Sequence, residues 1–307
     1  VARKPGSRHA IDRGAPGRVL RSQVDPEGFA PKAFEVSQDE VLPGVASVAA
    51  AGIACLVGFM LPVFNLLAKA VLVDGALSGS NFANLLTTGT RNLLSITVLQ
   101  ATFNSVRNTL LATLIALAIG FLVSYLVTHS HSKFGIRILN LAYAIPLGVS
   151  TVILGLGYLV GFSQPPFELR SSWLVIPLAQ SLIALPLVVR LLTDALKQIS
   201  PEVKEAATMD GATPTQIWWQ VELPLAQPSI VAAAGFAAVI ALGDFGAASF
   251  LSFGDQETLP VVLYALISRP GGTNYGMAMA ASVLLMLAVT LVVLAVSWRP
   301  RARTTGR

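Results

Sequence analysis

Charged residues are scarce in this chain: Asp, Glu, Lys and Arg make up 12% of its 307 residues, against about 25% in soluble domains. The sequence has one cysteine, Cys55, which excludes a disulfide framework or a cysteine-rich metal site within it. It also lacks the Gly-x-x-x-x-Gly-Lys phosphate loop, so we expect that the chain does not bind ATP itself. Because Cys55 lies inside an apolar run, we expect a small buried apolar residue and not a nucleophile.

Long apolar segments dominate the sequence instead. Hydrophobic residues make up 54% of the chain, and its mean hydropathy is +0.68. A run of about 20 apolar residues is long enough to cross a bilayer as a helix, and there are six such runs. They are approximately residues 44–72, 104–127, 138–161, 173–193, 229–251 and 275–297. The sequence therefore predicts an all-α polytopic membrane protein with six transmembrane helices, in which neighbouring helices accommodate the internal prolines.

The positive charges are divided unevenly between the two sides of these spans. Of the 21 Lys and Arg residues, 16 fall on the side of the two termini and of the 194–228 loop. This bias predicts that both termini and that loop are cytoplasmic. We expect residues 1–40 to be a disordered basic tail that helps to set topology and has no binding role, ahead of a transmembrane domain over 41–307. The net charge of +5 then needs no nucleic-acid partner.

The cytoplasmic loop begins with the signals of a short helix. Ser200 is a good N-cap, Pro201 suits the first helical position, and Glu202 lies near the positive end of the helix dipole. Gly211 is the residue type that best tolerates the left-handed turn that ends a helix. The segment therefore predicts a helix that begins after Ser200 and ends near Gly211.

A second helix start follows immediately. Thr213 and Gln216 have the spacing of a capping box, and Pro224 is expected to end this second helix. The loop is thus predicted to hold two short helices hinged at a glycine. Ala206 and Ala207 leave a thin face that another backbone can approach closely.

The extended pattern of this loop resembles the cytoplasmic docking loop of binding-protein-dependent ATP-binding-cassette (ABC) importer permeases. That pattern is Glu-Ala-Ala, then Asp-Gly-Ala, then a hydrophobic helix and Leu-Pro-Leu. The residues that match it are Glu205, Ala206, Ala207, Asp210, Gly211, Ala212, Leu223, Pro224 and Pro228. Trp218 and Trp219 stand where the family often has phenylalanine. The resemblance implies that residues 104–297 form the family's five-helix core and that 44–72 is an additional outer helix.

The resemblance also implies partners and a mechanism. The chain would be a permease subunit in a bacterial cell membrane, paired with a second permease subunit that is either a copy of itself or a sister chain. ABC ATPase subunits would dock on the cytoplasmic loop, and an external solute-binding protein would deliver the solute. The chain itself would be no enzyme and would need no cofactor. ATP binding would switch the bundle between inward- and outward-facing states.

One carboxylate lies inside a predicted span. Asp244, between Gly243 and Gly246, falls in the outer half of the 229–251 run. An intramembrane carboxylate is costly and normally faces protein or water. Two interpretations stay open: a role in the translocation pathway, or a structural ion pair with Arg107, which lies at comparable depth in the second span. The flanking glycines also permit a break in the helix or a close helix contact.

The sequence also bears on the identity of the solute. Residues 242–246, with the Glu-Thr-Leu-Pro segment at 257–260, are similar to permeases of thiamine and iron(III) importers, which favours those solutes. Polyamines and anions are alternatives, because related permeases share this segment. An ion-coupled secondary transporter that uses Asp244 is a further alternative, although no internal repeat supports it. His129 and His131 lack cysteine partners, so we expect solvated loop histidines and no metal site.

Overall fold

The structure, a computed structural model, describes residues 38–73, 75–90, 92–130, 132–163, 172–269 and 271–298. Except for its last three residues, the predicted tail of residues 1–40 lies outside this part of the chain. The chain divides into two compact units, Val1–Gly58 and Phe59–Arg307, and the boundary falls within helix α1 (Gln38–Val71). Each unit is described by itself.

The described part of the first unit is a single apolar helix. Residues Ser47–Val71 of α1 are long and apolar enough to cross a membrane, with a mean hydropathy of 2.2. Cys55 is exposed on this helix, so its predicted burial within protein is wrong. The reason is that no described neighbour in its unit covers α1, whose residues 47–58 are all exposed.

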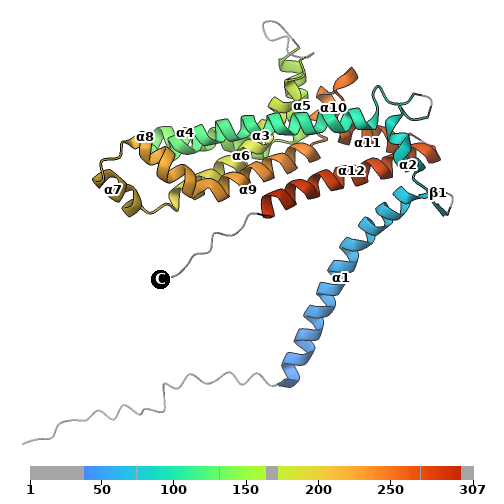
Figure 1. Ribbon diagram of the computed structural model, residues 1–307, viewed down its shortest axis with the longest axis horizontal. Coiled ribbons are helices and arrows are strands. Elements are labelled where there is room, and N and C mark those ends of the chain that lie inside the picture. The colour runs from blue at the N-terminus through green and yellow to red at the C-terminus, as the bar shows by residue number, and fades with distance from the viewer. Residues whose placement is uncertain are drawn as a thin grey trace, which may run out of the picture. The chain divides into compact units, whose positions relative to one another are not determined.

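Three long helices form the centre of the second unit. They are α3 (Val98–His129), α6 (Val175–Lys197) and α9 (Leu223–Gly243), which pack against one another (Figure 1). Small residues make this close packing possible: a Cβ on Gly120 of α3 would lie 2.6 Å from Val188 Cγ1 of α6. Helix α12 (Gly272–Ser297) packs on α9, where a Cβ on Gly235 would overlap Val296. Such small-residue contacts are the usual means of joining helices in a membrane.

Two of the predicted spans are interrupted. The third consists of α4 (Lys133–Ala144), the 3₁₀ turn η3 (Ile145–Gly148) and α5 (Thr151–Gly161), with a bend of 105° at the break. Counting this bent pair as one span, the described residues hold up to six candidate spans, as the sequence predicts. The fifth span was predicted over 229–251, with glycines that permit a break. The break is present: α9 stops at Gly243, Asp244 is extended, and the short helix α10 (Ala248–Leu251) follows, so a continuous helix to residue 251 is wrong.

The two ends of this bundle carry different short elements. One end holds the strand pair β1 (Leu72–Val73) and β2 (Ala76–Leu77), with α2 (Ser80–Ala83), η2 (Asn84–Leu86), η5 (Gly254–Gln256) and α11 (Leu259–Ile267). The two strands are antiparallel, with Leu72 opposite Leu77. The other end holds α7 (Pro201–Met209), α8 (Pro214–Ile217) and the π turn η4 (Trp218–Glu222). Figure 1 shows α7 and α8 at the opposite end of the bundle from α2 and α11.

Candidate functional site

The first candidate site is the segment that contains α7 and α8. Ser200 caps α7 as predicted, because its hydroxyl accepts a hydrogen bond from the amide of Glu202 at 3.3 Å. Gly211 has a φ of +84°, the left-handed conformation predicted for the end of this helix. Thr213 and Gln216 form the predicted capping box, in which each side chain accepts a hydrogen bond from the other residue's amide. These local predictions are confirmed.

The predicted end of the second helix at Pro224 is wrong. Helices α8, η4 and α9 form one continuous helical segment, Pro214–Gly243. Pro224 lies in the first turn of α9, directly after the π turn Trp218–Glu222. A proline lacks the amide that would bond back along the helix, and a π turn just before it accommodates that missing bond. The second helix of the loop is therefore the beginning of the fifth span.

Most of the predicted docking residues lie on an accessible surface. Exposed ones are Glu205, Ala206, Asp210, Gly211 and Pro224, and half-buried ones are Ala207, Ala212 and Leu223. Helix α7 buries none of its residues, and it presents apolar side chains to the outside. Met209, at its C-terminal end, is 88% exposed. The segment is thus a preformed, uncovered surface that is continuous with a span.

Sequence reasoning missed the charged cluster that fastens this segment. Glu222 is 1% exposed, and its Oε1 forms an ion pair with Lys204 Nζ of α7 at 2.6 Å. His129 Nε2, at the end of α3, lies 3.2 Å from the same oxygen. His129 is exposed to solvent as predicted, but it ends α3 and contacts Glu222, which the sequence did not predict. His131 lies outside the described residues. An acid buried in an otherwise apolar helical turn was the available signal, since a carboxylate is rarely buried without a partner.

The second candidate site is the interruption after α9. Asp244 is 7% exposed, and its two carboxylate oxygens accept hydrogen bonds from the amides of Ala247 at 3.2 Å and Ala248 at 3.3 Å. The carboxylate therefore holds the first turn of α10 against the end of α9. This places an irregular stretch of backbone inside the bundle, where its amides are satisfied by a side chain.

The two interrupted spans meet at this point. A Cβ on Gly246 would overlap Thr151 Oγ1 at the start of α5. A Cβ on Gly155 of α5 would lie 2.7 Å from the Cα of Ala247. The glycines at 155 and 246 therefore allow backbone to pack directly on backbone, as the predicted close contact at Gly246 requires. Gly243, in contrast, faces open space.

Arg107 does not pair with Asp244. Its Nη2 donates a hydrogen bond to Gln256 Oε1 at 2.7 Å, and its guanidinium lies over the ring of Trp173, 5.2 Å from the ring centroid. Ion pairs among the described residues involve other groups. The ion-pair interpretation of Asp244 is therefore wrong, because each group is engaged by a different part of the fold.

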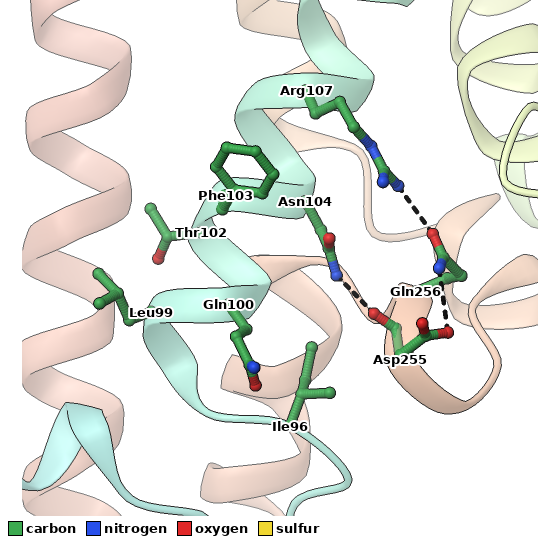
Figure 2. A pocket seen from close by; sticks show the side chains of 9 residues that line it. All are labelled: Ile96, Leu99, Gln100, Thr102, Phe103, Asn104, Arg107, Asp255 and Gln256. Atoms are coloured by element: carbon green, nitrogen blue, oxygen red, sulfur yellow. Dashed lines mark hydrogen bonds between the residues drawn. The ribbon is translucent and has the colours of Figure 1, made fainter.

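Arg107 borders a cavity of about 640 Å³ near the N-terminal end of α3. Figure 2 shows the lining residues Ile96, Leu99, Gln100, Thr102, Phe103, Asn104, Arg107, Asp255 and Gln256. The guanidinium of Arg107 and the amide of Gln256 point toward each other across its rim. Asp255 Oδ1 accepts a hydrogen bond from Gln256 Nε2 at 3.0 Å. One cation and one carboxylate thus border the same space.

The loop that carries Gln256 is fixed to α3. Asn104 Nδ2 donates hydrogen bonds to the carbonyls of Asp255 at 2.7 Å and Glu257 at 3.0 Å, and the amide of Leu259 donates to Ser105 Oγ at 2.8 Å. Burial raises the pKa of Glu257, an effect that the hydroxyl of Ser95, 3.3 Å away, opposes. The wall of the cavity is therefore held in place independently of Arg107.

Comparison with known proteins links the chain to one family. The family described as binding-protein-dependent transport system inner membrane component matches residues 129–301, more than half of the chain. The putative 2-aminoethylphosphonate transport system permease protein PhnV of Salmonella paratyphi A is 28% identical over 156 residues, which are 51% of this chain and 57% of PhnV. The molybdenum transport system permease protein ModB of Mycobacterium bovis is 30% identical over 187 residues, 56% of this chain and 69% of ModB.

Solved structures share the fold. A chain of a bacterial ABC transporter involved in the import of the acidic polysaccharide alginate superposes with a TM-score of 0.69 at 17% identity, over 84% of this chain and 95% of that chain. A chain of the MetNI methionine ABC transporter in an inward-facing conformation gives 0.54 at 22% identity, over 65% and 92%. The present chain spans a little more than half the length of PhnV. On the family match and this fold, the chain belongs to the binding-protein-dependent transport system inner membrane components.

Proposed function

We propose that the chain is the membrane permease subunit of an ABC importer, with ATP hydrolysis in separate ATPase subunits. The observation that carries this proposal is the uncovered α7–Gly211–α8 segment in a member of this family. Because α8 continues through η4 into α9 without a break, a displacement of α8 moves the fifth span with it. The chain then supplies the translocation pathway and the helices that move, and the ATPase subunits hydrolyse ATP.

The proposed partners follow from the two ends of the bundle. ATPase subunits would dock on the predicted residues around Glu205 and Gly211, and an external solute-binding protein would approach the opposite end. A second permease subunit, a copy or a sister chain, and a lipid bilayer would cover the sides. One alginate transporter of this fold is described in complex with a pentasaccharide-bound periplasmic protein. The charge bias supports a cytoplasmic position for both termini in a bacterial cell membrane.

For the solute, we favour a small oxyanion. The resemblance of residues 242–246 and 257–260 to other permeases favours thiamine or iron(III) instead. At the cavity, the hydrogen-bond acceptors of Arg107 are the neutral amides of Gln256 and Asn108, and the buried Nε of Arg107 has no hydrogen-bond partner among the described residues. Asp244, which would attract a cation, already binds two backbone amides. PhnV and ModB are named for 2-aminoethylphosphonate and molybdenum transport. Because Asp255 borders the same cavity, an oxyanion that also carries an amine fits as well.

Uptake in membrane vesicles that contain the native complex tests both parts. Labelled molybdate, 2-aminoethylphosphonate, thiamine and ferric iron are the probes, each with and without ATP on the cytoplasmic side. We expect ATP-dependent accumulation of an oxyanion. Arg107→Gln should reduce it, and Arg269→Gln, which removes an exposed arginine outside this cavity, should leave it unchanged. Accumulation of thiamine or iron would overturn the solute proposal alone. A chain that neither transports any probe nor co-purifies with an ATPase would overturn the permease proposal.

A further inference from the structure

Three elements meet at one buried carboxylate beside the docking segment. Glu222, the last residue of η4, forms the 2.6 Å ion pair with Lys204 of α7 and contacts His129 of α3 at 3.2 Å. Only 1% of the Glu222 side chain is exposed, against 30% for Lys204 and 34% for His129. The carboxylate is thus shielded from solvent, and it faces the ammonium group of Lys204 on one side and the ring nitrogen of His129 on the other.

Aromatic rings hold the histidine in place. The ring of Tyr125 stacks on His129 with centroids 4.3 Å apart, and Trp218 meets Tyr125 edge-on at 4.8 Å. Trp218 also lies edge-on to His129 at 6.1 Å. Since Trp218 begins the π turn that Glu222 ends, the same turn supplies both the aromatic wall and the acid. A π turn within a helix is often found at a functional position.

Helix α7 depends on this cluster for its attachment. It buries no residue of its own, so apolar packing contributes little to its position. Among the described residues, the Lys204–Glu222 contact is the one hydrogen bond or ion pair that joins a side chain of α7 to another element. The second carboxylate oxygen of Glu222 is buried without a partner in the same part of the chain. A buried carboxylate in that state relies strongly on its remaining cationic partner.

We propose that Glu222, Lys204 and His129 are the positioning residues that make α7 move together with α3 and α9. The inference rests on the proposed function, because it concerns how a docked ATPase transmits its motion to the spans. Lys204 lies next to Glu205 of the docking surface, so a force on that surface passes through Lys204 to Glu222 at the start of α9. His129 joins the same carboxylate to α3, and the two spans therefore follow α7 as one body.

A distance measurement between α7 and α3 tests this link without knowledge of the solute. Spin labels are placed at two exposed positions, Met209 at the end of α7 and Leu122 on α3, in a Cys55→Ser background, with the full chain in its native complex. The distance distribution is measured by pulsed electron paramagnetic resonance without nucleotide and with a non-hydrolysable ATP analogue. We expect a single narrow distribution that is the same in both states. A nucleotide-dependent change in this distance in the unaltered cluster would overturn the proposal.

Substitutions separate positioning from folding. Lys204→Met keeps the length of the side chain and removes its charge, and it should broaden the distribution. Loss of one partner of an ion pair whose carboxylate is buried shifts a two-state equilibrium by roughly tenfold or more, so the detached conformer should become readily detectable. Lys197→Met is the matched control, because it removes an exposed lysine at the end of α6. The control should keep the narrow distribution.

Lys204→Met leaves a buried unpaired carboxylate and can lower the amount of folded protein. The double variant Lys204→Met/Glu222→Met removes that charge and should restore the amount, while the distribution stays broad. A double variant as narrow as the unaltered protein would overturn the proposal, since apolar packing would then suffice. Co-purification of an ATPase with the Lys197→Met control tests the permease function separately, so failure of the link and failure of the proposed function give different results.

Discussion

Substitution of Gly246 by alanine tests the contact between the two interrupted spans. A Cβ at this position would overlap Thr151 Oγ1, and it would lie 2.9 Å from Thr151 Cβ and 3.1 Å from the amide nitrogen of Val152. Overpacking of this kind costs about 1–3 kcal/mol. For a domain of this size each kcal/mol lowers the unfolding temperature by about 2–4 °C. We therefore expect a fall of about 2–12 °C in the detergent-solubilised protein, followed by tryptophan fluorescence.

A control and a rescue make this prediction specific. Gly243→Ala adds the same methyl group three residues earlier, where no atom lies within 4 Å, and it should be neutral or stabilising by up to about 1 kcal/mol because alanine favours the helix. Thr151→Ala removes the overlapping oxygen and should recover part of the loss in the double variant with Gly246→Ala. If Gly246→Ala is as stable as Gly243→Ala, the two interruptions do not pack as described.

Three further predictions concern coupling, topology and the carboxylate in the bundle. Gly211→Val forces a β-branched residue to a φ of +84° and should reduce ATPase co-purification without lowering the amount of protein. Asparagine tolerates that φ, so Gly211→Asn should preserve co-purification. Equal loss in both variants would point away from backbone strain. With Cys55 replaced by serine, a cysteine at Gly272 should react with an impermeant thiol reagent in intact cells and one at Met209 should not; the reverse pattern would overturn the proposed orientation. Asp244→Asn retains one acceptor oxygen for two amides, so we expect a loss of about 1–2 kcal/mol in thermal unfolding, and an unchanged stability would contradict the capping role.

The sequence predicted the parts of the fold that depend on local chemistry. The caps at Ser200 and Thr213 and the left-handed Gly211 were correct, because each depends on hydrogen bonds or backbone freedom within a few residues. The number of spans was also predictable, since the length of an apolar run can be read directly from the sequence and compared with the thickness of a bilayer. The glycines around Asp244 permitted a break, but the sequence did not require one, because the packing of Gly246 against α5 depends on residues far away in the chain.

The partners of the charged residues were the least predictable feature. Similar depth suggested an Arg107–Asp244 pair, but depth along a span does not specify the face on which a side chain lies. Arg107 instead turns toward Gln256 on a loop more than a hundred residues away in sequence. The identity of the partner of Glu222 was likewise not predictable from the sequence, because its contact with Lys204 depends on α8 continuing into α9 through a π turn.

Photo-crosslinking from the α7 surface tests the central claim most directly. A photoreactive amino acid is placed at Met209, which is 88% exposed, or at Leu77 in β2 at the other end of the bundle, which is 81% exposed. The adducts formed in intact cells are identified by mass spectrometry. We predict that Met209 crosslinks to a polypeptide with the phosphate loop of an ATPase and that Leu77 does not. An ATPase adduct from Leu77, or none from Met209 in protein that is folded and in the membrane, would contradict the proposal that this segment couples ATP hydrolysis to transport.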